Sequence, residues 1–150
     1  MIIPWLSELD GIDYPTQIQQ YLIPDIFPND GPPHEHHPHA LALYHAILDL
    51  KAQTVVETGT RNCRSLRIII EAVKQTGGHA YSIDTTVYPL RVRESTDTQY
   101  VTLLTGHSLE VPWEQPINVF FSDSSHEYNI VMEELDRFWP FITTPGLAIV

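Results

Sequence analysis

The chain has 150 residues, of which 43% are hydrophobic and 18% are charged, a balance typical of one globular domain rather than of a disordered chain. Nineteen acidic residues stand against eight basic ones, which gives a formal net charge of −11. Because the phosphates of nucleic acids repel such a surface, and no basic patch with aromatic residues is present, the composition argues against nucleic-acid binding.

The sequence contains no targeting or membrane signal. No apolar run approaches the ~20 residues that span a bilayer. The N-terminal residues 1–5 have neither a basic region nor an apolar stretch of signal-peptide length. We therefore expect an intracellular, cytoplasmic protein without membrane contacts. The single cysteine, Cys63, excludes an intrachain disulfide and a multi-cysteine metal site.

Residues 1–39 differ in composition from the rest, since they hold seven of the twelve prolines. Turn and breaker residues fill positions 27–33, and a short helix is expected from about Thr16 to Ile26. We expect this stretch to form a Pro/His-rich arm or cap on one domain that spans 40–150. The run His34–His39 has the composition of a metal site, but its proline-interrupted spacing favours a solvated loop.

The remainder alternates between helical and strand patterns. A helix is expected from Ala40 to about Ala52, because Leu41, Tyr44, Ile47 and Leu48 recur at helical spacing. Further helices are expected at 65–75, closed by Gly77-Gly78, and at 127–141, and strands at 54–57, 80–84, 100–104, 117–121 and 147–150. This alternation predicts an α/β fold with a mainly parallel, Rossmann-like doubly wound sheet.

Two further expectations concern the end of the chain and its tryptophans. The sequence stops at the predicted fifth strand, so either the sheet is minimal or the chain is a truncated piece of a longer protein. Trp113 and Trp139 are both expected to pack in the core.

Polar residues follow four successive predicted strands, and ligands of open parallel sheets bind at the carboxyl ends of strands. Gly59 permits a tight turn and the close approach of a ligand to the following helix N-terminus, although a plain strand-to-helix turn would look the same. Asp84 ends the second strand, where a carboxylate can accept hydrogen bonds from ribose hydroxyls, although a helix cap would also explain it. The triplet Gly106-His107-Ser108 indicates either an adenine neighbour or a turn.

Asp123 and His126 are the candidates for chemistry. An acid and an imidazole three residues apart, just past an apolar strand, can deprotonate a hydroxyl or contribute metal ligands. Alternatively, Asp123 or Ser124 caps the next helix and His126 lies in its first turn. Cys63 is interpreted as a small packing residue.

Four segments together resemble the class I S-adenosylmethionine-dependent methyltransferases. Residues 55–60 with Ser65 are similar to the first motif of the small-molecule branch, V-E-x-G-x-x-x-G-x-S. Residues 81–84 resemble the second motif, and residues 119–128, with Val131 and Glu134-Leu135, resemble F-I-D-G-x-H-x-Y…V…D-L. The run 141–150 is similar to L-x-P-G-G-x-I-V. Cys63 and Ser124 stand where the family usually has glycines, and the run Thr144-Pro145-Gly146 has one glycine where two are common.

The resemblance implies strand order 3-2-1-4-5, with S-adenosylmethionine (SAM) bound across the first two strand ends. It implies that Glu57, Gly59 and Thr60 flank the methionine part of SAM and that Asp84 holds the ribose. Residues 106–108 (Gly106, His107 and Ser108) would neighbour the adenine. Asp123 would face the methionine amine or a metal, and Asp123 with His126 would be catalytic.

The function expected from the resemblance is methyl transfer to a small-molecule acceptor, at oxygen. Dependence on a divalent metal and homo-oligomer formation are both left open. A second hypothesis, motivated by Cys63 and the short chain, is a non-catalytic cofactor-binding or assembly protein of the same fold. A third is a nicotinamide oxidoreductase, against which the missing G-x-G-x-x-G fingerprint counts.

Overall fold

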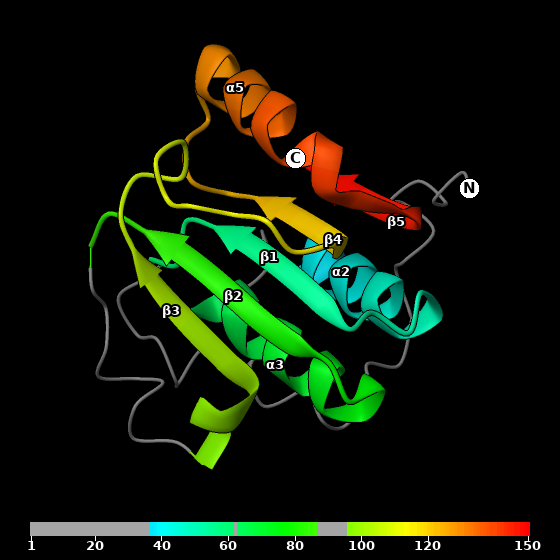
Figure 1. The fold of residues 1–150 in the computed structure, drawn as a ribbon. Coiled ribbons are helices and arrows are strands. Elements are labelled where there is room, and N and C mark those ends of the chain that lie inside the picture. The colour runs from blue at the N-terminus through cyan, green and yellow to red at the C-terminus, as the bar shows by residue number, and fades with distance from the viewer. Residues whose placement is uncertain (1–36, 62, 87–95) are drawn as a thin grey trace.

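The computed structural model describes residues 37–61, 63–86 and 96–150. Its central feature is a sheet of five strands in the order β3-β2-β1-β4-β5, and every neighbouring pair is parallel (Figure 1). The predicted Rossmann-like fold and the strand order 3-2-1-4-5 are confirmed. The strands are β1 (Thr54–Thr58), β2 (His79–Asp84), β3 (Val101–Thr105), β4 (Ile117–Ser122) and β5 (Ile142–Ile149).

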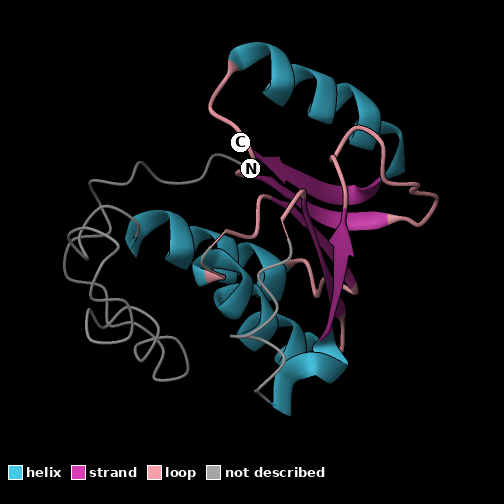
Figure 2. Cartoon of the chain, turned by 90° about the vertical axis from the view of Figure 1, so that its left-hand side faces the viewer, coloured by secondary structure: helices cyan, strands magenta, loops and turns pink. Residues whose placement is uncertain are grey.

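Helices cover both faces of this sheet (Figure 2). On one face, α2 (His37–Asp49) and α3 (Arg64–Thr76) enclose a core cluster that includes Val55. On the other, α5 (Tyr128–Phe138) covers a second cluster that includes Val56. Consecutive strand residues point to opposite faces, so the apolar pair at the centre of β1 serves both cores. In the described ranges, no helix is both long and apolar enough to cross a membrane.

Proline and glycine lie near the ends of two helices. Helix α2 contains Pro38 as the second residue of its described range, His37–Asp49. The solvated loop expected for His34–His39 is therefore wrong for residues 37–39, whereas residues 1–36, with the helix expected at 16–26, lie outside the described residues. Helix α3 ends as predicted at a glycine, since its C-cap Gly77 has φ 73°.

The C-terminal part departs from expectation in two ways. The helix expected at 127–141 ends at Phe138 and continues as the short 3-10 helix η5 (Trp139–Phe141), because Pro140 has no N–H for an α-helical hydrogen bond. Strand β5 begins at Ile142, well before the predicted 147–150, and contains the cis peptide bond before Pro145. A register shift in its pairing with β4 accommodates this irregular half.

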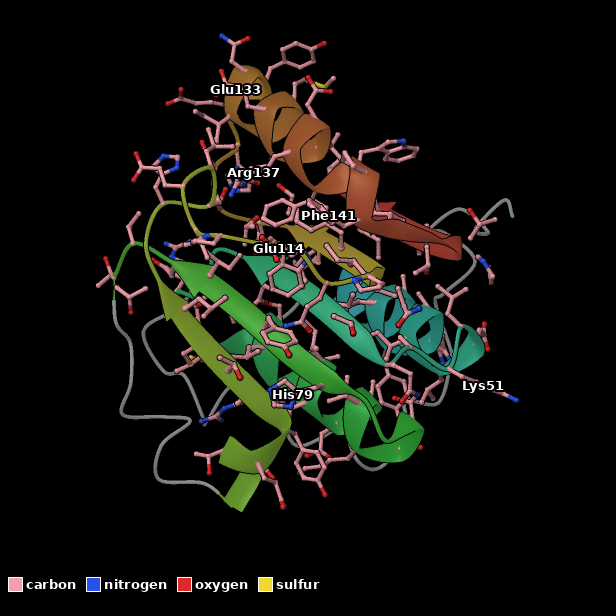
Figure 3. All side chains as sticks on the ribbon, viewed as in Figure 1. Lys51, His79, Glu114, Glu133, Arg137 and Phe141 are labelled. Atoms are coloured by element: carbon pink, nitrogen blue, oxygen red, sulfur yellow. The ribbon has the colours of Figure 1, made fainter. Side chains whose placement is uncertain are left out.

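The connection from β3 to β4, residues 106–116, contains no helix. Its Trp113 is 8% exposed and meets the ring of Tyr81 edge-on, with centroids 4.9 Å apart. Arg137 of α5 donates a hydrogen bond of 2.5 Å to the carbonyl of Val111 and so ties the connection to the helix (Figure 3). Packing of Trp113 is thus confirmed, whereas Trp139 is 64% exposed and its predicted packing is wrong.

Candidate functional site

A cavity of about 300 Å³ opens at the carboxyl end of the sheet, a volume at the lower end of the range for small-molecule sites. Its wall contains five residues named from the sequence: Gly59, Asp84, Gly106, His107 and Ser108. Residues that the sequence did not single out as cofactor contacts complete the wall: Ile83, Thr85, Ser124, Ser125, Glu127 and Ile130. The strand ends therefore meet around one hollow, as expected for a parallel sheet.

Gly59 brings the turns after β1 and β4 into contact. Its φ is 89°, and a Cβ atom added there would lie 2.4 Å from the carbonyl oxygen of Asp123. The same two turns are joined by the hydrogen bond from the Asp123 N–H to the carbonyl of Thr58, at 2.9 Å. A side chain at position 59 would push the two turns apart, so the glycine is needed both for its backbone angle and for space.

Asp84 combines a position in the wall with a role in holding the first turn. Its Oδ2 accepts hydrogen bonds from the backbone N–H groups of Thr60 and Arg61, at 2.9 and 3.0 Å. Its Oδ1 accepts one from the N–H of Thr86, at 2.8 Å. A carboxylate has about four lone-pair sites. Among the residues that the structure describes, two of these bonds go to Oδ2 and one goes to Oδ1.

Glu57 lies beneath the cavity instead of in its wall, with 1% of its surface exposed. Its carboxylate accepts a hydrogen bond from the hydroxyl of Ser65, at the start of α3. It accepts another from the hydroxyl of Ser82, at 2.5 Å. Ser82 in turn pairs with the Thr60 hydroxyl at 2.6 Å, which places Thr60 in the same buried network. Burial raises the pKa of Glu57 to about 7 against the opposing effect of the two serine hydroxyls, and the nearby charges of Asp123 and Asp84 add to the rise.

The candidates for chemistry, Asp123 and His126, are exposed and lie outside the cavity wall. His126 stands between two wall residues, Ser125 and Glu127. The alternative that Asp123 or Ser124 caps the next helix is wrong, because α5 is capped by Glu127 without a side-chain cap bond. In residues 37–61, 63–86 and 96–150, no group of three or more metal-binding side chains comes together.

Glu134 of α5 is the buried carboxylate whose place in the site sequence reasoning missed. It is 0% exposed, and its Oε2 accepts hydrogen bonds from the hydroxyls of Thr58 and Ser122, at 2.9 and 2.6 Å. Its Oε1 accepts one from the wall residue Ser124, at 2.5 Å. The available signal was a glutamate four residues before the core residue Phe138, on the helix face that packs against the sheet.

Cys63, the N-cap residue of α3, has a backbone conformation that L-amino acids rarely adopt. Its φ is 60°, in the left-handed region that glycine adopts without strain. Its side chain is 1% exposed and belongs to the core cluster beneath α2 and α3, not to the cavity wall. The interpretation of Cys63 as a packing residue is confirmed.

A parallel sheet in this order, with a glycine turn after β1 and an acid at the end of β2, is a Rossmann-like arrangement that class I methyltransferases share with dinucleotide-binding proteins. The model of the family described as "Methyltransferase domain" matches residues 56–150, and the chain belongs to this family of enzymes. No curated protein matches the sequence significantly.

Solved structures show the same fold at low sequence identity. A methyltransferase from Geobacter sulfurreducens has 15% identity and a TM-score of 0.68, with 95% of this chain and 74% of that chain covered. The SAH-bound methyltransferase PaMTH1 of Podospora anserina has 15% identity and a TM-score of 0.64, over 99% and 71%. The O-methyltransferase TomG of Streptomyces achromogenes, in complex with SAM, has 16% identity and a TM-score of 0.59, over 88% and 65%. The chain thus spans between 65% and 74% of the length of these three proteins.

Proposed function

We propose that the protein transfers a methyl group from SAM to a small-molecule acceptor, at oxygen. The observation that carries the proposal is the cavity that Gly59 and Asp84 line in a chain of the methyltransferase family. The likeness to an O-methyltransferase in complex with SAM supports the choice of cofactor and of oxygen. We further propose that the protein acts in the cytoplasm, with residues 1–39 as an arm on the domain.

The polar groups around the cavity suit SAM. The Asp84 carboxylate, in the cavity wall, suits a ribose hydroxyl as its acceptor. Gly106, His107 and Ser108 form the part of the wall proposed for the adenine. SAM carries a positively charged sulfonium and an amine, and the Asp84 carboxylate in the cavity wall favours a cation there.

The proposed roles in the reaction follow from the chemistry of the cofactor. When bound, SAM supplies an electrophilic methyl group, so the protein has to align the acceptor and remove its proton. Asp123 or His126, on the exposed segment before α5, would accept that proton from the acceptor hydroxyl. Asp123 is also the position at which a divalent metal would bind. The acidic surface argues against a polyanionic acceptor.

Calorimetric titration of the purified chain with SAM and with its demethylated product SAH tests the proposal. Asp84→Asn is expected to weaken binding about tenfold or more, since it removes a charged acceptor of ligand hydroxyls, which corresponds to about 1.4 kcal/mol. The matched control is Asp49→Asn, which removes an exposed acid at the end of α2 and is expected to leave affinity unchanged. Absence of binding by the unmodified chain at millimolar ligand would refute the proposal.

A further inference from the structure

We propose that Glu134 is a positioning residue for the cofactor cavity, which it serves by holding Ser124 in the wall. The identity of the ligand rests on the function proposed above, whereas the positioning itself is a property of the ligand-free protein.

The first step of the argument is the depth and bonding of Glu134. Its side chain is 0% exposed, although a buried carboxylate is costly unless hydrogen bonds compensate for lost water. Three hydroxyls provide this compensation, and they come from β1, from β4 and from the turn after β4. These three hydrogen bonds join helix, strands and turn at one buried carboxyl group.

The second step concerns what holds Ser124. Ser124 and the preceding Asp123 are exposed, so the turn has little buried surface to fix it. On one side, a Cβ atom at Gly59 would lie 2.6 Å from the Ser124 Cα, so the two backbones are already close together. On the other side, the Ser124 hydroxyl donates its hydrogen bond to Glu134 Oε1 at 2.5 Å. Ser124 is therefore held between the turn after β1 and a buried carboxylate.

If Glu134 only stabilised the fold, loss of either serine hydroxyl that binds it would have the same effect on ligand affinity. Variants of the two serines therefore distinguish a stabilising role from a positioning role. Ser122→Ala and Ser124→Ala each remove one hydroxyl from the same carboxylate, but only Ser124 belongs to the cavity wall. If Glu134 positions the wall, Ser124→Ala should raise the SAH dissociation constant five- to tenfold. Ser122→Ala should lower the melting temperature and leave the dissociation constant within twofold of the unmodified chain. Equal affinities of the two variants would overturn the proposal.

Amide hydrogen exchange in the ligand-free protein separates positioning from a direct contact between Ser124 and the ligand. Exchange across residues 123–127 is expected to be at least tenfold faster in Ser124→Ala than in Ser122→Ala. Ser124→Thr, which keeps a hydroxyl, should restore slow exchange. Weaker SAH binding with unchanged exchange would indicate a direct contact and overturn the proposal. If the unmodified chain does not bind SAH, the proposed function fails, and the exchange result alone decides the role of Glu134.

Discussion

Replacement of Glu57 by glutamine should change how the stability of the protein depends on pH. The folded protein buries this carboxylate and raises its pKa from 4.5 to about 7, chiefly by removing water from it. Between these two pH values the unfolded chain loses the proton while the folded chain keeps it. Unfolding therefore becomes easier as the pH rises from about 4.5 to about 7, and the loss is complete above that range.

The size of the effect follows from the two pKa values. A rise from 4.5 to about 7 corresponds to roughly 3 kcal/mol of stability that is present at low pH and absent above neutrality. Glutamine keeps the shape of the side chain and carries no titrating group, so Glu57→Gln should lack this pH-dependent contribution to stability. Urea unfolding at about pH 5 and about pH 8 measures this difference. Between these two pH values, the free energy of unfolding of the unmodified chain should fall by roughly 2 to 3 kcal/mol more than that of the variant.

Glu133→Gln is the matched control, because it removes one carboxylate from an exposed position of α5 (Figure 3). Its stability profile should run parallel to that of the unmodified chain. A parallel profile for Glu57→Gln would refute the reasoning, since it would mean that Glu57 is ionised in the folded protein throughout this range.

Two further substitutions test the packing around the site. Gly59→Ala should lower the free energy of unfolding more than Gly77→Ala, by about 1 to 3 kcal/mol, because both glycines have positive φ but only the former would meet backbone atoms. Thermal unfolding of both variants measures this, and equal losses would contradict the close approach of the two turns. Trp113→Ala should lower the free energy of unfolding by about 3 to 5 kcal/mol, because Trp113 is 8% exposed and its removal leaves a cavity. Trp139→Ala should change it by less than about 0.5 kcal/mol, because Trp139 is 64% exposed. Urea unfolding checks the pair, and a large loss for Trp139→Ala would indicate that it packs in solution.

The order of elements could be predicted from the sequence because each strand and helix has its own periodicity. The rule that ligands bind at strand ends also located Gly59, Asp84 and the 106–108 turn, all of which line the cavity. The start of strand β5 was harder to predict, because a proline such as Pro145 normally argues against a strand. Only the pairing with β4 makes the earlier start favourable. Local patterns contain no information on such pairing.

The rest of the site depends on tertiary contacts. Ser124, Glu127 and Ile130 reach the cavity because of where α5 begins, and helix boundaries are the least certain part of a sequence-based assignment. The bonding of Glu134 depends on tertiary structure, because its partner Thr58 is 76 residues away and Ser122 and Ser124 reach it only when α5 packs on the sheet. The catalytic roles of Asp123 and His126 stay predictions.

The alternation of Glu57 and Thr58 at the end of β1 also protects the correct pairing of the sheet. Glu57 faces the side of α3, where Ser65 binds it, and Thr58 faces α5, where it binds Glu134. A slip of β1 by one residue would exchange the two faces and bring the Glu57 carboxylate toward that of Glu134. Two buried acids would then compete for the same hydroxyls, and the hydrogen bonds lost in this way would raise the free energy of the slipped sheet. A strand whose apolar residues, Val55 and Val56, would fit either face thus has its register fixed by one acid and one hydroxyl.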